Sequence, residues 1–134
     1  MERSRDWLKQ AERDLEQARW ALKGGFYEWT CFSAQQAAEK AVKALIEALR
    51  REAWGHSITR LLASLPQGFE VERELMEKAM GLDKFYIQTR YPNGFPVGAP
   101  MDYYTEEEAK RAVGYAEEII SFCRRHLARI SGAD

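Results

Sequence analysis

This chain of 134 residues has few cysteines, few histidines and almost no net charge. It has two cysteines, two histidines and a formal net charge of −1 at pH 7. Neither Cys31 nor Cys123 has a cysteine or histidine nearby at the spacing of metal ligands, so we expect no disulfide framework, no metal and no cofactor. The balanced charge is not typical of a general nucleic-acid-binding surface. Any anionic ligand must therefore be bound by a local group of residues.

Long apolar runs are also missing. No stretch is both long enough and apolar enough to cross a bilayer, and the first residues, MERSRDW, are charged where a signal peptide would be apolar. We therefore expect a cytoplasmic protein that does not bind membranes. Because 46% of the residues are hydrophobic, a chain of this length can bury a core. We expect residues 1–134 to form a single domain.

The apolar residues recur at the spacing of α-helices, and no segment alternates as a half-buried strand does. Five helices are predicted: about residues 4–23, ended by Gly24 and Gly25; about 27–51; a short helix between an N-cap at Ser57 and Pro66; about 70–89, ended before Pro92; and a last helix from a capping box at Thr105 and Glu108 to about residue 127. The fold class is all-α, an up-and-down four-helix bundle with one additional short helix.

Two charged residues do not fit the pattern of the fourth helix. On a helical wheel, Asp83 and Arg90 fall within a broad apolar arc that includes Tyr86. An unpaired buried charge costs several kcal/mol, so both residues need partners. Arg90 either caps the last carbonyls of its own helix and pairs with an acid, or presents its planar guanidinium to phosphate at the rim of a cleft. Tyr86 and Tyr91 are compatible with both interpretations.

The second helix contains the run SAQQAAEKAVKAL, residues 33–45. Glu39 lies at the margin of its apolar face and is the candidate partner of Arg90 across the bundle. Lys40 and Lys43 point away from the centre of that face. Glu39 and Lys43 are four residues apart, and we interpret them as a solvated pair worth a few tenths of a kcal/mol.

An oligomer is favoured by two apolar features. Trp20 lies off the apolar stripe of the first helix, and the apolar arc of the fourth helix is wider than one neighbour within a bundle covers. We therefore expect a homodimer or a higher homo-oligomer.

Four motifs in order resemble a HEPN domain. They are AQQAAEKAVKAL in the second helix, GHSITRLL at the third, LDKFYIQTRYPNG at the end of the fourth and YYTEEEAKRAVGYAEEI in the fifth. The resemblance covers about residues 6–127. It implies a helical bundle related to the C-terminal domain of kanamycin nucleotidyltransferase, usually dimeric and often encoded beside a minimal nucleotidyltransferase. Many such proteins are metal-independent ribonucleases, commonly toxins of toxin–antitoxin pairs.

The ribonuclease signature of the family is an arginine followed, after about four to six residues, by a histidine, in a site assembled across the dimer. Arg90 matches the arginine, but residues 95–97 are Phe-Pro-Val, and the histidine is absent. Tyr91 and Asn93 are poor substitutes, because an ordinary tyrosine titrates near pH 10 and asparagine does not titrate.

The sequence therefore favours a nucleotide- or RNA-binding module over an enzyme, with a minimal nucleotidyltransferase as a candidate partner. The candidate ligand-binding residues are Arg90, Tyr91, Asn93, Tyr86, Asp83, Glu39, Lys40, Lys43 and His56. His56 matches the Gly-His of the family and is interpreted as a capping or packing residue. Two alternatives stay open: a ribonuclease with an atypical site, in which only Arg90 is assigned to catalysis, and an interaction dimer without a ligand.

Overall fold

Helices account for most of residues 2–131, the part of the chain that the computed structural model describes. They are α1 (Ser4–Gly24), α2 (Tyr27–Ala48), α3 (Ile58–Ala63), α4 (Arg73–Asp83), α5 (Phe85–Gln88) and α6 (Glu106–Ile130), with two 3-10 turns, η1 (Pro92–Gly94) and η2 (Pro100–Asp102). Residues 2–131 contain no β-strand, and the predicted all-α bundle is confirmed. No helix in this range has the length and apolarity needed to cross a membrane.

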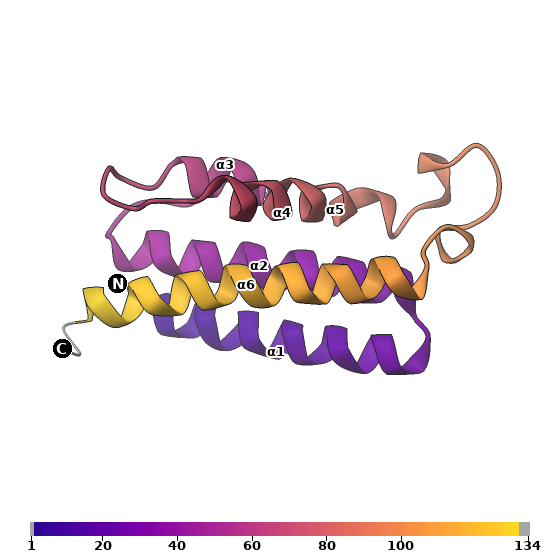
Figure 1. Cartoon of the computed structure of the whole chain (residues 1–134), viewed down its shortest axis with the longest axis horizontal. Coiled ribbons are helices and arrows are strands. Elements are labelled where there is room, and N and C mark those ends of the chain that lie inside the picture. Colours follow the sequence, from indigo (N-terminus) through magenta and orange to yellow (C-terminus); the bar gives the residue numbers. More distant parts are fainter. Residues whose placement is uncertain (1, 132–134) are drawn as a thin grey trace.

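The bundle is built around α2. This helix packs against α1 and α6, and α3, α4 and α5 contact it from another side. Figure 1 shows the result as three tiers: α1, then α2 with α6, then the row of α3, α4 and α5. Several alanines of α2 have no exposed surface, namely Ala34, Ala37, Ala38, Ala41 and Ala44. Their small side chains allow neighbouring helices to approach closely.

The helix ends carry the signals that the sequence predicts. α1 is followed by Gly25 in the left-handed conformation, with φ of 81°, which glycine adopts at little cost. Ser57 Oγ accepts a hydrogen bond from the Arg60 amide at 3.2 Å, and Thr105 Oγ1 accepts one from the Glu108 amide at 3.1 Å. Both are side-chain N-caps, which satisfy amides that lack partners in the first turn of a helix.

The predicted fourth helix, residues 70–89, is shorter and divided. α4 begins only at Arg73, because the backbone of Glu72 is extended (φ −62°, ψ 151°). It ends at Asp83, and the separate turn α5 follows Lys84. The backbone of Lys84 is itself close to helical (φ −65°, ψ −18°), and Figure 1 shows both pieces in one row. The interruption is therefore local.

The end of α2 also differs from the prediction. The helix stops at Ala48 instead of about residue 51, and Arg50 adopts a left-handed backbone with φ of 60°. The chain thereby turns into the irregular segment that leads to α3.

Candidate functional site

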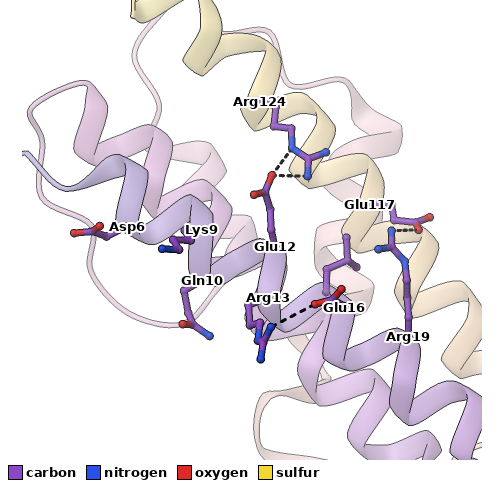
Figure 2. Close-up of a pocket in the computed structure, with 10 residues that line it drawn as sticks. Asp6, Lys9, Gln10, Glu12, Arg13, Glu16, Arg19, Glu117 and Arg124 are labelled. Carbon is purple, nitrogen blue, oxygen red and sulfur yellow. Dashed lines mark hydrogen bonds and ion pairs between the residues drawn. The ribbon is translucent and has the colours of Figure 1, made fainter.

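A groove of about 770 Å³ runs between α1 and α6, and charged side chains line it (Figure 2). Arg19 Nη2 lies 2.6 Å from Glu117 Oε2, and Arg124 Nη2 lies 2.5 Å from Glu12 Oε2. These pairs neutralise one another and are about half exposed. The groove therefore presents no excess of either charge from these four side chains, and we place the candidate site elsewhere.

Arg90 lies directly after α5, on the other side of α2. Its Nε and Nη2 donate hydrogen bonds to the carbonyl oxygen of Tyr86 at 3.0 and 2.6 Å. The guanidinium carbon lies 4.4, 4.9 and 5.2 Å from the ring centroids of Phe32, Tyr86 and Tyr91, within the range of cation–π attraction. The bonds to a carbonyl of its own helix are those expected in the first of the two alternatives for Arg90.

Arg90 has no acidic partner among residues 2–131. The prediction that Glu39 pairs with it is wrong. Aromatic rings and one carbonyl surround the guanidinium instead, so its full positive charge stays uncompensated by any described carboxylate.

Glu39 is at the centre of a different, buried cluster on α2. Its Oε1 accepts a hydrogen bond from Gln35 Nε2 at 2.9 Å, and its Oε2 lies 2.9 Å from Lys43 Nζ and 3.0 Å from His56 Nδ1. Glu39 is 4% and Lys43 9% exposed. The interpretation of Glu39 and Lys43 as a solvated pair is therefore wrong. Residues from outside α2 approach the pair: His56 contacts the carboxylate, and Lys43 Nζ lies 5.6 Å from the centroid of the Trp7 ring of α1.

The Glu39 carboxyl remains ionised despite its burial. Burial alone would raise its pKa, but the hydrogen bonds from Gln35, Lys43 and His56 outweigh that effect and hold the pKa below its ordinary value. A carboxylate with several donors is stabilised in its charged form.

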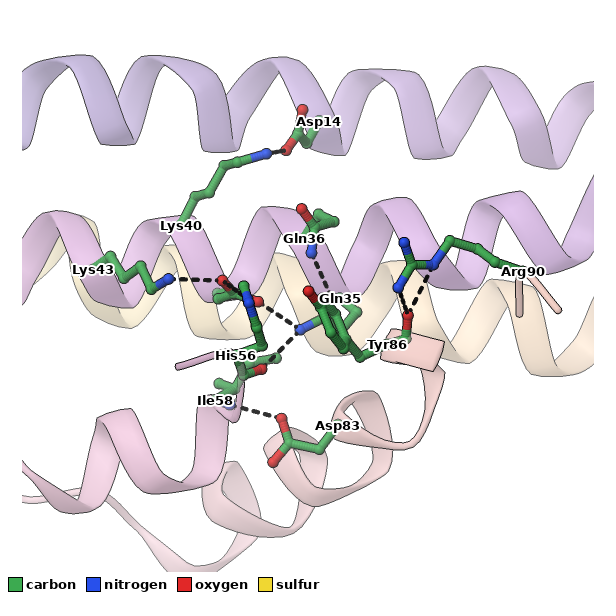
Figure 3. Close-up of polar contacts among 11 residues, drawn as sticks. Asp14, Gln35, Gln36, Lys40, Lys43, His56, Ile58, Asp83, Tyr86 and Arg90 are labelled. Carbon is green, nitrogen blue, oxygen red and sulfur yellow. Dashed lines mark hydrogen bonds and ion pairs between the residues drawn. The ribbon is translucent and has the colours of Figure 1, made fainter. Parts of the chain in front are cut away.

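His56 connects this cluster to Arg90 (Figure 3). Its ring stacks on Tyr86, with centroids 4.3 Å apart and an interplanar angle of 15°, and its carbonyl oxygen accepts a hydrogen bond from Gln35 Nε2 at 3.1 Å. The stacking on Tyr86 is the packing role expected for His56. In addition His56 forms the contact with Glu39, which the sequence did not predict.

Asp83 has the partners that its position on the wheel required. Its Oδ1 accepts a hydrogen bond from the Ile58 amide at 2.7 Å, and its Oδ2 accepts one from Ser57 Oγ at 3.0 Å and one from the Thr59 amide at 3.2 Å. These bonds fix the first turn of α3 to the end of α4. Asp83 therefore helps to hold the segment that carries His56.

The remaining candidates lie at the edge of this arrangement or outside it. Lys40 pairs with Asp14 of α1 at 2.5 Å and extends toward α1 (Figure 3). Tyr91 is 49% exposed beside Arg90, and Asn93 lies exposed in η1. The structure thus brings Arg90, Tyr86, Tyr91, His56, Glu39 and Lys43 into one connected group, and leaves Lys40 apart from it.

Phe32 and Gln35 also contact this group and were not among the candidate residues. Both share one stripe of α2 with Glu39, at offsets of three, four and seven residues, which is the spacing of one helix face. Continuing that stripe back from Glu39 would have identified them.

Residues 2–131 contain no group of three or more His, Cys, Asp or Glu side chains placed to hold a metal ion. Cys31 and Cys123 are buried free thiols. Burial, with small contributions from Glu108 and Glu28, raises the pKa of Cys31 to about 12, so this thiol is unreactive near neutral pH.

Comparison with known proteins gives a consistent result. The HEPN domain family matches residues 4–126. The chain is 48% identical to TT1696 from Thermus thermophilus, whose crystal structure superposes with a TM-score of 0.92 over 94% of this chain and 99% of that one. The chain is also 44% identical to an HEPN domain protein from Thermotoga maritima. The crystal structure of that protein superposes with a TM-score of 0.77 over 92% of this chain and 98% of that one.

A curated relative adds a functional name. The chain is 26% identical to "Putative toxin MJ1304" of Methanocaldococcus jannaschii in an alignment 130 residues long that covers 90% of this chain and 86% of that protein. The order of helices, the matched residues and the solved relatives agree, and the chain belongs to the HEPN domain family.

Proposed function

We propose that this HEPN protein binds a nucleotide or single-stranded RNA, and that Arg90 holds a phosphate group. The observation that carries the proposal is a guanidinium without an acidic partner among residues 2–131, fixed at one end by the Tyr86 carbonyl. The bonds to Tyr86 leave the N–H groups of Nη1 for another acceptor. A planar arginine fork held in this way suits a phosphate oxygen.

Exposed aromatic rings beside Arg90 support a nucleotide over a simple anion. Tyr91 is 49% exposed, and Trp29 is 43% exposed and packs edge-on against Phe32 with centroids 6.1 Å apart. Unpaired bases stack on such rings, and the combination of a cation with stacking surfaces is typical of sites for single-stranded nucleic acids.

The biological setting that we propose is a toxin–antitoxin-like pair. The name of the M. jannaschii relative supports it, and a minimal nucleotidyltransferase is the partner that the family resemblance favours. We further propose a homo-oligomer, because Trp20 and Ile87 are 68% and 59% exposed on the described surface. Sedimentation that shows only a monomer at micromolar concentration would remove the oligomer from the proposal.

The test is the affinity of purified protein for a fluorescent single-stranded RNA that carries 2′-O-methyl groups, with ATP as a competitor. Arg90→Ala is expected to weaken binding by about tenfold to a hundredfold, because a hydrogen bond to a charged group contributes about 1.5–3 kcal/mol. Arg90→Lys should lose only part of the affinity, because lysine keeps the positive charge but lacks the planar set of N–H donors. Arg73→Ala is the matched control, since the Arg73 side chain is 93% exposed and pairs only weakly with Glu77.

Circular dichroism and sedimentation of each variant separate binding from folding and assembly. Equal affinities of wild type and Arg90→Ala would contradict the proposal. No binding by the wild type, together with loss of the oligomer in Arg90→Ala, would favour an interaction dimer in which Arg90 serves the interface.

A further inference from the structure

We propose that a pocket at one end of the bundle, lined by Arg5 and Arg50, binds an acidic peptide segment of a partner protein. This pocket, which we call the terminal pocket, has a volume of about 780 Å³ and lies where the first turn of α1, the end of α2 and the last turns of α6 meet. Figure 1 shows these three helix ends together, at the opposite end of the molecule from the loop that follows α5. The terminal pocket is independent of the proposed function, because Arg90 and its aromatic neighbours do not line it.

Arg50 occupies a position at which the fold favours glycine. Its amide donates a hydrogen bond to the carbonyl oxygen of Glu47 at 2.9 Å, and the amide of Arg51 donates one to the carbonyl oxygen of Ile46 at 3.2 Å. These two bonds form the Schellman motif that ends α2, in which the residue at the position of Arg50 is left-handed and usually glycine. Arg50 has a φ of 60°, which is costly for a residue with a Cβ atom. Arginine therefore stands here at a cost in stability, which indicates a role other than ending the helix.

Arg5 also occupies a position that its helix disfavours. It is the second residue of α1, where the positive end of the helix dipole favours acidic side chains over basic ones. Neither Arg5 nor Arg50 has an ion pair within residues 2–131. The terminal pocket is thus lined by two arginines that oppose local preferences of the fold and lack acidic partners. Such departures from local rules are typical of functional positions.

The lining of the terminal pocket has an excess of positive charge. Its charged side chains are four arginines and two acids, namely Arg3, Arg5, Arg50, Arg124, Glu2 and Asp6. Arg3 pairs with Asp6 at 2.9 Å, and Arg124 pairs with Glu12 at 2.5 Å. The charges that remain are the two positive charges of Arg5 and Arg50 and the single negative charge of Glu2, so one positive charge is not balanced.

The Glu2 carboxylate is an anion that already lies in this lining. It accepts hydrogen bonds from the Ser4 amide at 2.6 Å and from the Ser4 hydroxyl at 2.5 Å. These bonds lower the pKa of Glu2, and the positive charges of Arg50 and Arg5 contribute to the lowering. The field of the two arginines therefore acts on a carboxylate in the terminal pocket. Because one carboxylate balances only one of the two charges, the pocket favours a further anion.

The apolar part of the lining indicates a peptide and not a nucleic acid. It is aliphatic, formed by Leu8, Ala48, Leu127, Ala128 and Ile130, and among residues 2–131 no aromatic ring lines the pocket. Single-stranded nucleic acids bind where their bases stack on aromatic side chains. Carboxylates that alternate with aliphatic side chains complement guanidinium groups beside leucine and isoleucine. The volume of the terminal pocket lies in the usual range for ligand-binding pockets.

The test measures the binding of a short fluorescent peptide of alternating glutamate and leucine to the full chain by fluorescence anisotropy. The wild type is expected to bind this peptide more tightly than a lysine–leucine peptide or a glutamate–serine peptide of the same length. The lysine–leucine peptide tests the charge, and the glutamate–serine peptide tests the aliphatic contact. Raising the salt to about 0.5 M should weaken binding, because ions screen exposed charges.

Two variants remove the arginines without harm to the fold. Arg50→Gly gives the Schellman motif its usual residue, and Arg5→Glu places an acid in the first turn of α1. Both should keep or raise the melting temperature. Each should weaken binding of the glutamate–leucine peptide by about tenfold or more, because a contact with a charged group is lost. Arg111→Ala is the matched control, since Arg111 is exposed on α6 and does not line the pocket.

Four results would overturn the proposal. They are no binding of the glutamate–leucine peptide by the wild type, equal binding by Arg5→Glu, Arg50→Gly and the wild type, equal binding of the glutamate–serine peptide, and a lower melting temperature of Arg50→Gly. Binding of inorganic pyrophosphate that depends on the two arginines, without binding of the peptide, would assign the pocket to a small anion and would also contradict the proposal. RNA binding at Arg90 is measured with a different probe, so failure there leaves the terminal pocket untouched, and the reverse holds as well.

Discussion

The two charged regions of the bundle differ in how their charges are satisfied. In the groove between α1 and α6, Arg19 and Arg124 each pair with a glutamate across the groove, in partly exposed positions (Figure 2). On the opposite side of α2, the pair of Glu39 and Lys43 is buried, and Arg90 has no carboxylate within residues 2–131 (Figure 3). The groove of about 770 Å³ belongs to the first region, but the cation without a carboxylate partner belongs to the second.

This difference is the reason why we propose the ligand site at Arg90 and not in the groove. Exposed ion pairs contribute little to stability and leave no field for a ligand. A cation surrounded by rings and one carbonyl attracts an anion more strongly, because the apolar neighbours screen it less than water does. Removing one charge from each region tests whether the two regions differ in this way.

The largest effect on stability is expected from Glu39→Ala. It leaves Lys43 as a buried cation without its carboxylate and removes an acceptor from Gln35 and His56. The loss should be about 3–5 kcal/mol in the free energy of unfolding, measured by urea denaturation. Glu12→Ala in the groove is the counterpart and should lose less than about 1 kcal/mol. Equal losses would mean that burial does not distinguish the two regions.

A smaller effect is expected on the stability of the folded protein at acidic pH. The folded-state pKa of Glu39 lies below its ordinary value of 4.5, so the folded protein binds this proton less readily than the unfolded chain. The stability that the carboxylate contributes is present above pH 4.5 and is lost as the pH falls through the folded-state pKa. Unfolding of Glu39→Gln should therefore depend less steeply on pH in this acidic range than unfolding of the wild type. Parallel profiles would assign the acid sensitivity to other carboxylates.

Much of the fold was predictable because its signals are local. The caps at Ser57 and Thr105 and the glycine after α1 are read directly from the sequence, and each is in place. Asp83 and Arg90 were identified as charges in an apolar arc, and both are bound by backbone groups. A helical wheel is sufficient for such inferences, since it describes one helix by itself.

The partners across helices were not predictable in the same way. A wheel shows that Glu39 lies at the margin of an apolar face, but not that His56 and Trp7 approach this margin from outside α2 or that Lys43 is buried with Glu39. His56 lies in the irregular segment after α2, where no periodicity fixes the direction of a side chain. Its approach to Glu39 depends on Asp83, which anchors the first turn of α3 from 25 residues away along the chain.

The smallest effect is expected from Arg124→Ala in the groove. The Arg124 pair with Glu12 is about half exposed, so a double-mutant cycle with Glu12→Ala should give a coupling of about 0.2–1 kcal/mol. At about 0.5 M salt the coupling should fall further, because ions screen exposed charges. RNA binding by Arg124→Ala should equal that of the wild type. Weaker RNA binding would show that the groove takes part in recognition, and the contrast between a neutralised groove and an unbalanced Arg90 site would no longer hold.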